Sequence, residues 1–443
     1  MKVNFKDKTV GGFNFEFVRG ISTQRIGAAE FGECMETMDR VKDGNFESWM
    51  SEWTVTADRV ANFAAKARQL GDRTSARAAF LKASNYYRMA VFYAPPTDPR
   101  HTELWKRSKD CFHCMIQLMD SSIESLDIDF EGTKLPAYFV SGGEGKRPTL
   151  IALGGFDSTM EEVYGWIGTA AADYGWHCLI FEGPGQWSAL KLNPGLRFTP
   201  DYERPVKAVV DYALSRPDVD GERLALIGYS MGGYLAPRAA AFEPRIKACI
   251  PDSLVVDAGE AVKEAPFFKL GHVSDRILDG LYALISRRRA YARWYLQHAQ
   301  WTLGIRYPHE YLEAWKPYTL KGLEDHFHSP MLFLFSEDDI IDLAAPSPKI
   351  VQEILQFILS LTCNRTVHLF TRSEGASSHC QLGGLSYAHA VIFQWLNQAL
   401  CGEGLSVQSN AAPRKTFVET FRKHAGEIGA EKAQELLDCV QLI

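Results

Sequence analysis

The sequence predicts an α/β protein in which a mostly parallel, eight-stranded sheet follows a helical N-terminal domain and carries a helical cap. From residue 122 to about residue 400, short apolar runs alternate with helical stretches, as in parallel sheets covered by helices. Several runs, such as 149–153 and 331–335, are apolar on both faces, which is typical of strands buried on both sides. Strong strand signals are absent before residue 122.

Residues 1–121 form the predicted helical domain. Residues 75–92 are rich in helix-forming side chains, and Pro95-Pro96 stops that helix. An earlier helix carries Trp49 and Trp53 four positions apart, so that both lie on one face. We therefore expect the first part of the chain to fold as helices alone.

The predicted sheet domain covers residues 122–400. Its eight strands are expected at about 123–130, 135–141, 149–153, 176–181, 223–227, 246–250, 331–335 and 365–370. The stretch from about 254 to about 325 is too long for an ordinary crossover and has a helical pattern, so we interpret it as an inserted cap. Residues 401–443 begin as a linker and include an amphipathic helix at about 416–440.

Composition and charge restrict the class of protein. The chain has 443 residues, of which 46% are hydrophobic, which is enough for a large core and excludes a disordered chain. Its 48 Lys and Arg residues and 54 Asp and Glu residues give a net charge of −6, without long basic runs. This balance argues against nucleic acid as the main partner.

No targeting or membrane segment is evident in the sequence. Residues 1–17 carry charges and glycines where a signal peptide needs an apolar run of about 7–15 residues. No stretch approaches the ~18 apolar residues of a membrane span. The nine cysteines are scattered and odd in number, which fits reduced thiols better than a disulfide framework. We therefore expect a cytoplasmic protein with no membrane partner.

The most informative segment is Gly228-Tyr229-Ser230-Met231-Gly232-Gly233. It follows a predicted buried strand directly and leads into an Ala-rich helix, which is the context of a nucleophile elbow. Ser230 is the candidate nucleophile, and the N–H of Met231, beside a helix N-terminus, is a candidate donor to a developing oxyanion. The alternative is a glycine-rich turn that serves only close packing of helix and strand.

A serine hydroxyl needs a base, and the base needs an acid that orients it. In this kind of site both residues follow the serine along the chain. Ser336-Glu337-Asp338-Asp339 comes directly after strand 331–335, at the carboxyl edge where such sheets place their sites. Asp339 is the candidate acid, and Asp338 and Asp342 are the alternatives.

Twelve histidines compete for the role of base, and their positions remove most of them. Only His379 and His389 lie beyond the last predicted strand without falling in the C-terminal extension. His389 belongs to a predicted helix on the flank of the sheet, whereas His379 lies in the loop 374–383 at the carboxyl edge. His379 is therefore the candidate base.

The second oxyanion donor is expected in the loop Gly154-Gly155-Phe156-Asp157-Ser158. Two glycines allow close approach of the backbone, and the Phe156 N–H is the candidate donor. Asp157 is a candidate substrate contact. The alternative is structural, because Ser158 and Glu161 have the spacing of a capping box, and Asp157 and Ser158 would then simply begin the next helix.

Two further residues are candidate substrate contacts. Glu182 follows strand 176–181 at the same edge, where it either contacts substrate or braces the loop. Tyr229 directly precedes the candidate nucleophile. This chemistry needs a small-molecule substrate and requires neither a metal nor an organic cofactor.

Six segments occur together and in order: 43–53 (DGNFESWMSEW), 75–88 (SARAAFLKASNYYR), 154–162 (GGFDSTMEE), 181–186 (FEGPGQ), 228–233 (GYSMGG) and 374–381 (EGASSHCQ). With these segments the chain resembles the 2,6-dihydroxypseudooxynicotine hydrolase family, which has the α/β-hydrolase fold. That family includes fungal polyketide-shortening hydrolases of the pigment-forming type. The resemblance spans roughly residues 20–400, and residues 401–443 depart from the family pattern.

The resemblance implies a catalytic triad of Ser230, Asp339 and His379, a helical N-terminal domain that closes over the active site, and often a homodimer. Members of the family cleave a carbon–carbon bond beside a ketone, frequently in 1,3-dicarbonyl or acylphenol substrates. A polyketide-like substrate in secondary metabolism is therefore implied for this chain.

Relatives can use an additional acid near the cap, and Asp257, Glu260 and Glu264 lie in that region. Two other functions stay open. An esterase, lactonase or acyltransferase would use the same triad on a related metabolite. A catalytically silent protein would keep the fold for binding alone, but the full set of candidate catalytic residues argues against it.

Overall fold

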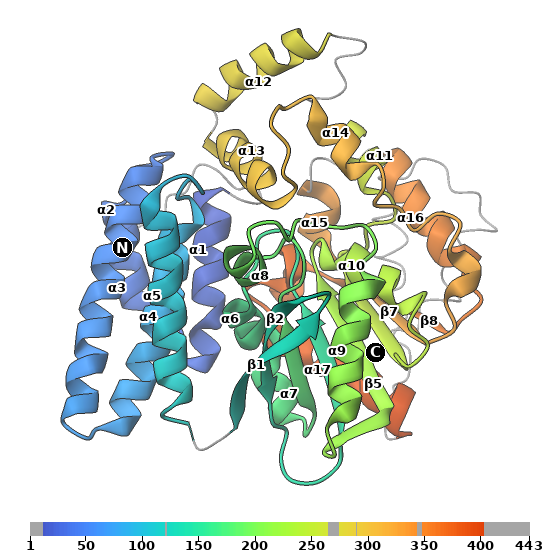
Figure 1. The fold of residues 1–443 in the computed structure, drawn as a ribbon, viewed down its shortest axis with the longest axis horizontal. Helices are drawn as coiled ribbons and strands as arrows, with labels where there is room; N and C mark the ends of the chain where they lie inside the picture. The colour runs from blue at the N-terminus through green and yellow to red at the C-terminus, as the bar shows by residue number, and fades with distance from the viewer. Residues whose placement is uncertain (1–11, 120–121, 265–273, 289, 343–347, 403–443) are drawn as a thin grey trace.

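The structure, a computed structural model, describes residues 12–119, 122–264, 274–288, 290–342 and 348–402 (Figure 1). The amphipathic helix expected at about 416–440 lies outside these residues. The described chain consists of a group of N-terminal helices, one sheet with helices on both faces, and a set of helices above the sheet in the view of Figure 1.

The strands form one eight-stranded sheet in the order β1-β2-β4-β3-β5-β6-β7-β8. They are β1 (Ile123–Phe130), β2 (Thr133–Val140), β3 (Arg147–Leu153), β4 (His177–Phe181), β5 (Val219–Tyr229), β6 (Ala248–Asp252), β7 (Met331–Ser336) and β8 (Arg365–Phe370). β2 runs antiparallel to β1 and β4, and the other neighbouring strands are parallel. The predicted eight-stranded, mostly parallel sheet is therefore confirmed.

One central strand ends later than the sequence pattern predicts. β6 continues through Pro251 to Asp252, and Pro251 pairs with Gly228 while Asp252 pairs with Tyr229. A proline lacks the N–H that a central strand normally donates, which is why the pattern predicts an end before Pro251. The observed register places Asp252 beside the residue that precedes Ser230.

Helices cover both faces of the sheet and share two buried clusters with it. One face packs against α6 (Met160–Val163), η2 (Tyr164–Gly168), α7 (Thr169–Asp173) and α17 (Leu385–Leu396), and the other against α9 (Glu203–Ser215), α10 (Gly232–Ala240) and α16 (Pro348–Ser360). Side chains alternate between the faces, so that Leu150 belongs to the first cluster and Ile151 to the second. The shorter helices are α8 (Trp187–Leu192), α15 (Glu337–Asp342), η5 (Arg372–Glu374), η6 (His379–Gln381) and η7 (Asn397–Cys401).

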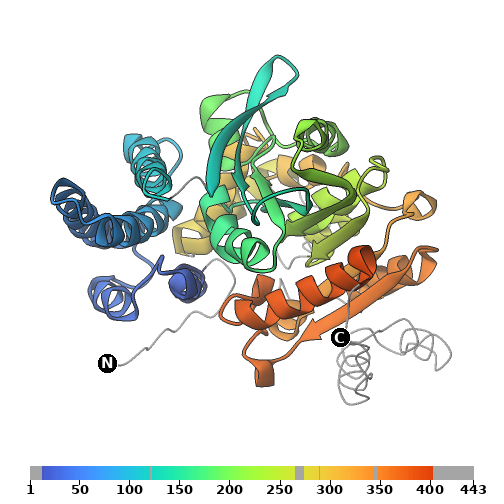
Figure 2. The same ribbon diagram turned by 90° about the horizontal axis from the view of Figure 1, so that it is seen from below.

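The N-terminal helices lie beside the sheet domain, as the blue helices in Figure 2 show. They are α1 (Phe13–Ile21), η1 (Ser22–Ile26), α2 (Phe31–Arg40), α3 (Phe46–Gln69), α4 (Arg73–Phe92) and α5 (Pro99–Ile116). Asn45, Asp72 and Asp98 cap α3, α4 and α5 by accepting backbone N–H groups of the first turn. Trp49 and Trp53 are fully buried on α3, and they belong to the same buried cluster as one face of the sheet.

Among the described residues between β6 and β7, four α-helices lie above the sheet in Figure 1. They are α11 (Ala258–Glu264), α12 (Asp275–Arg288), α13 (Ala290–Thr302) and α14 (Glu310–Trp315), followed by η4 (Glu324–His326). The Trp294 indole of α13 donates to the carbonyl of Phe92 at the end of α4, with a distance of 2.8 Å. These helices therefore contact the N-terminal helices as well as the sheet domain.

Buried charges join the N-terminal helices to the sheet domain. Arg19 of α1 binds Glu162 of α6 through two nitrogens, at 2.7 and 2.9 Å. Arg88 of α4 lies 3.3 Å from the same carboxylate and 3.1 Å from Glu16 of α1. All four side chains are almost inaccessible to water. Removing charges from water is costly, so the pairs are stable only while the two parts stay docked.

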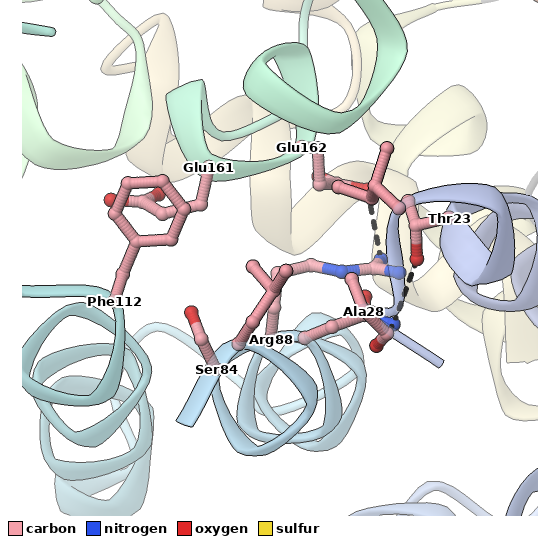
Figure 3. Close-up of a pocket in the computed structure, with 10 residues that line it drawn as sticks. Thr23, Ala28, Ser84, Arg88, Phe112, Glu161 and Glu162 are labelled. Carbon is pink, nitrogen blue, oxygen red and sulfur yellow. Dashed lines mark hydrogen bonds and ion pairs between the residues drawn. The ribbon is translucent and has the colours of Figure 1, made fainter. Parts of the chain in front are cut away.

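A small cavity lies within this interface (Figure 3). Its volume is about 20 Å³, which is enough for one water molecule. Thr23 of η1, Ser84 and Arg88 of α4, and Glu161 and Glu162 of α6 contribute to its lining. The lining of this cavity therefore combines charged and polar groups with the Phe112 ring.

We expect Glu162→Gln to destabilise the protein by about 3 kcal/mol, because Arg19 and Arg88 lose a buried counter-charge. The amide can still serve in the cap of α6, so the helix itself should persist. Urea unfolding measures the free energy of unfolding. Glu47→Gln is the control, because its ion pair with Arg100 is exposed and should contribute less than about 1 kcal/mol. Equal losses in the two variants would contradict the importance of the buried pairs.

Candidate active site

Ser230 lies in a tight turn between β5, which ends at Tyr229, and α10, which begins at Gly232. Its φ of 59° is in the left-handed region, which non-glycine residues rarely adopt. The turn permits only small neighbours, since a Cβ at Gly228 would lie 2.2 Å from the Gly232 carbonyl and one at Gly233 2.1 Å from the Ser253 carbonyl. The glycines and the strained serine thus have the geometry that the nucleophile elbow requires.

Asp339 and His379 meet at the carboxyl ends of β7 and β8. Asp339 lies in α15, directly after β7, and His379 opens η6 in the loop after β8. The Nδ1 of His379 lies 2.7 Å from Oδ2 of Asp339, and both side chains are buried. Burial by itself lowers the pKa of His379, but the carboxylate of Asp339 outweighs it and holds that pKa well above its usual range.

Ser253 adds a second hydrogen bond to the same carboxylate. Its hydroxyl donates to Oδ2 of Asp339 at 2.5 Å and lies 3.4 Å from Nδ1 of His379. Within the described chain, no hydrogen bond joins Ser230 to His379 directly. The Phe15 ring of α1 lies 6.1 Å from the His379 ring, so the N-terminal helices reach the edge of the site.

A hydrogen-bonded link beneath the site joins three loops. The amide of Gln381 donates to Oδ1 of Asp252 and to the hydroxyl of Ser336, each at 3.0 Å. The carbonyl of Asp252 accepts the N–H of Ser230 at 3.0 Å. Burial raises the pKa of Asp252 to about 7, and the nearby Asp339 also raises it. This link fixes the nucleophile turn, the end of β7 and the histidine loop relative to one another.

The loop after β3 lies directly against the turn that carries Ser230. A Cβ added to Gly155 would lie 2.7 Å from the Cβ of Ser230 and 2.8 Å from the nitrogen of Met231, so only glycine fits. Within the described chain, the N–H groups of Phe156 and Met231 donate no hydrogen bond. Both donors are therefore free to bind an oxygen atom beside Ser230.

The helix after this loop begins one residue later than the capping box considered from the sequence. Thr159 caps α6 with Glu162 as its partner, so the box is not formed by Ser158 and Glu161. Ser158 instead accepts the N–H of Gly155 at 2.9 Å. The helix begins later than expected because the Ser158 hydroxyl is used as the acceptor for the Gly155 N–H, where the loop turns against Ser230.

The three candidate substrate contacts differ in their surroundings. The side chain of Asp157 is 23% exposed and lies 3.3 Å from Arg19. The carboxylate of Glu182 is buried and accepts the backbone N–H groups of Met160 and Ser188, an arrangement that braces the loop. Tyr229 is buried in the core, where its ring packs against Trp166.

The alternative residues are engaged elsewhere. Asp338 accepts hydrogen bonds from Arg372 and Ser377, and Asp342 is the last residue of α15. His389 is buried in α17 and hydrogen-bonds to the Trp166 carbonyl, and burial lowers its pKa to about 4. Asp257 caps α11 through the N–H of Glu260.

Sequence reasoning missed Asp252, Ser253 and Gln381. The first two directly follow the apolar strand residues of β6 at the carboxyl edge, which is the signal that identified Asp339. Gln381 lies two positions after His379. Within the described residues, no group of three or more His, Cys, Asp or Glu side chains is arranged to hold a metal ion.

Comparison with known proteins identifies the protein family. A family model described as the alpha/beta hydrolase family matches residues 150–391, and one described as esterase FrsA-like matches residues 25–266. Each covers more than half of the chain. The protein therefore belongs to the α/β hydrolase family and is a hydrolase of that fold.

Several fungal hydrolases are related over most of their length. The 20-hydroxy-prefusarin hydrolase FUS2 of Gibberella moniliformis is 33% identical, over 87% of this chain and 96% of that protein. Hydrolase acrC of Aspergillus aculeatus is 30% identical over the same shares. Hydrolyase poxO of Penicillium oxalicum is 34% identical over 70% of this chain and 77% of its own.

Solved structures share the fold. The 2,6-dihydroxy-pseudo-oxynicotine hydrolase has a TM-score of 0.68 at 20% identity, over 88% of this chain and 99% of that chain. AbyA5 has a TM-score of 0.58 at 19% identity, over 91% and 98%. The predicted resemblance is thus confirmed for family and fold. In the described residues, no helix is long and apolar enough to cross a membrane.

We expect Asp339→Asn to lower kcat/KM by roughly 10³-fold or more, because the histidine loses its orienting carboxylate. A histidine base acts when neutral, so activity rises as the pH passes upward through its pKa. Without Asp339, burial dominates and lowers the His379 pKa, so the acid limb of the profile should move to lower pH. Hydrolysis of an activated ester from about pH 5 to about pH 9 measures both effects.

The matched control is Asp338→Asn, which removes the neighbouring carboxylate and its bond to Arg372. We expect this variant to keep the acid limb in place and most of the activity. An unshifted limb in Asp339→Asn, or an equal loss in the control, would contradict the pairing of Asp339 with His379.

Proposed function

We propose that this protein is a serine hydrolase that cleaves a carbon–carbon bond beside a ketone in a polyketide-like substrate of secondary metabolism. The observation that carries the proposal is the contact of 2.7 Å between Asp339 and His379 at the sheet edge that bears the strained Ser230. In this reading Ser230 is the nucleophile, His379 the base and Asp339 the acid that orients it. The related FUS2 is named a hydrolase of 20-hydroxy-prefusarin, which supports a small-molecule metabolite as the substrate.

The first half of the reaction makes an acyl-enzyme. His379 has its Nδ1 turned to Asp339, which leaves Nε2 to take the proton of the Ser230 hydroxyl. The Ser230 oxygen attacks the ketone, and the resulting oxyanion binds the N–H groups of Met231 and Phe156. The carbon–carbon bond then breaks, its electron pair leaves with the departing carbon, and the imidazolium of His379 returns the proton to that carbon.

The second half regenerates the enzyme. His379 takes a proton from water, and the hydroxide attacks the ester carbon of the acyl-enzyme. The ester bond breaks, Ser230 regains the proton, and a carboxylic acid is released. A carbanion is a poorer leaving group than an alkoxide, so the substrate must delocalise the charge, as a 1,3-dicarbonyl or acyl-aromatic compound does.

Aromatic side chains beside the oxyanion loop support a substrate of this kind. The Phe156 ring packs against Tyr295 of α13 at 5.4 Å and against Trp315 of α14 at 5.6 Å. Phe15 of α1, 6.1 Å from the His379 ring, adds an aromatic side chain from another part of the chain beside the candidate site. Asp157, partly exposed beside them, is the polar substrate contact that we propose.

A second candidate function is hydrolysis of an ester or lactone, or acyl transfer, on a related metabolite. The match to the model described as esterase FrsA-like over residues 25–266 favours it. The same acyl-enzyme would form, with an alkoxide as the leaving group. The two functions differ in substrate and share Ser230.

We expect the purified protein to cleave a β-diketone polyketide analogue into a ketone and a carboxylic acid, with an acyl-enzyme on Ser230 detectable by mass spectrometry. A panel of aryl esters is assayed in parallel. Turnover of esters alone, with the diketone untouched, would contradict carbon–carbon cleavage and favour the esterase.

The control is Ser230→Ala, together with labelling by a fluorophosphonate probe. We expect the probe to label the wild-type protein and not the variant. Equal behaviour of the two proteins would overturn the assignment of Ser230, whatever the substrate.

We further propose a homodimer, which the resemblance implies, and a cytoplasmic location, which the scattered, odd-numbered cysteines favour. Light scattering at micromolar concentration is expected to give twice the mass of one chain, and the mass of a single chain would contradict it.

A further inference from the structure

The loop that carries the Phe156 N–H is bound by side chains at each of its carbonyl groups. The amide of Gln186 donates to the carbonyls of Gly154 and Gly155, at 2.9 and 3.2 Å. The Nε2 of His298 lies 2.9 Å from the Phe156 carbonyl. The Asp157 carbonyl accepts the Trp187 indole N–H at 2.8 Å and an Arg19 N–H at 3.3 Å.

These donors come from separate parts of the chain. Gln186 and Trp187 belong to the loop and helix that follow β4, whereas His298 is on α13 above the sheet and Arg19 is on α1. A peptide group is planar, so the Gly155 carbonyl and the Phe156 N–H point in opposite directions. Holding the carbonyls on both sides of Phe156 therefore fixes the direction of its N–H.

The interaction of His298 has a defined protonation. A carbonyl oxygen can only accept, so Nε2 of His298 carries the proton and donates it. Burial lowers the pKa of this histidine, so the ring is neutral near pH 7 and Nδ1 carries no proton. Rings of Phe156 at 4.7 Å and Trp294 at 5.3 Å hold the imidazole in place.

We propose that His298 and Arg19 are positioning residues of the oxyanion hole. Gln186 holds the peptide that bears the Phe156 N–H through the Gly155 carbonyl. By binding the carbonyls of Phe156 and Asp157, His298 and Arg19 hold the backbone that follows, so that this N–H stays directed at the oxygen that develops beside Ser230. The hole is then complete only while α13 and α1 are both docked on the loop. This inference rests on the proposed serine hydrolase and assigns to the two helical regions a part in forming its oxyanion hole.

The first test compares His298→Leu with His298→Gln. We expect His298→Leu to slow ester hydrolysis by roughly 10- to 100-fold through kcat, with KM little changed, because one oxyanion donor loses its direction. The Gln side chain places an amide N–H near the position of Nε2, so His298→Gln should stay within about 5-fold of the wild type. Rates of labelling by a fluorophosphonate should follow the same order.

Trp301→Phe is the matched control. Trp301 lies on the same helix and in the same aromatic cluster, 5.6 Å from His298, but makes no hydrogen bond to the loop within the described chain. We expect this variant to lose stability without losing kcat. Thermal unfolding of each variant separates the loss of stability from the loss of rate.

A further readout separates positioning from packing. A boronic acid forms a tetrahedral adduct with a reactive serine and so resembles the transition state. We expect its affinity to fall in His298→Leu by the same factor as kcat. If His298→Leu does not fold, His298→Asn replaces it, because its side chain is too short for the amide to reach the Phe156 carbonyl.

Arg19→Lys tests the contribution of α1. Lysine keeps the positive charge but lacks the several N–H donors of the guanidinium, so we expect a lower kcat and a lower affinity for the boronic acid, as in His298→Leu.

The outcomes distinguish the inference from the function on which it rests. Wild-type protein that is not labelled at Ser230 would overturn the proposed function and the inference together. Labelled wild type with an equally fast His298→Leu would overturn the inference alone. A folded His298→Gln that is as slow as His298→Leu would also overturn the inference, because the hydrogen bond to the Phe156 carbonyl would then not determine the rate.

Discussion

The left-handed backbone at Ser230 is the constraint on which the rest of the site depends. Such a conformation costs a non-glycine residue about 1–3 kcal/mol and persists only where its surroundings impose it. Here the surroundings are the bond from the Ser230 N–H to the Asp252 carbonyl and the close contact between Gly233 and Ser253. Both depend on β6 extending to Asp252 beside β5. The pairing register of β5 and β6 therefore stabilises the strained backbone conformation of Ser230.

Strain is concentrated around this turn. Five non-glycine residues of the described chain have a positive φ, namely Glu131, Ser230, Ser253, Cys380 and Gln381. All except Glu131 belong to the candidate site or to the residues that follow His379. Ser230 and Ser253 turn the chain directly after β5 and β6, and Cys380 and Gln381 turn it within η6, so that side chains from separate loops converge. The positions of these residues indicate that the strained backbone lies at the candidate site and that packing in the rest of the protein stabilises it.

The fold was predictable from the sequence because its signals are local. Runs such as 331–335 mark buried strands, and the Gly-x-Ser-x-Gly pattern marks the turn, so Ser230, Asp339 and His379 could be chosen by their order along the chain. Ser253 and His298 could not, because their roles depend on contacts with residues far away in the sequence. The capping box at Thr159 shows the same limit, since a one-residue shift is decided by what Gly155 needs as an acceptor.

The charges around His379 explain how its imidazole can hold a proton in a buried place. Asp339 faces its Nδ1, itself accepts a hydrogen bond from Ser253, and raises the pKa of His379. Asp252 lies behind it with a pKa raised to about 7, and its ionisation is coupled to the charge on His379. A proton on His379 favours the ionised form of Asp252, because the two opposite charges attract. The ionised carboxylate in turn favours the protonated imidazole, so a second carboxyl group supports a positive charge on His379.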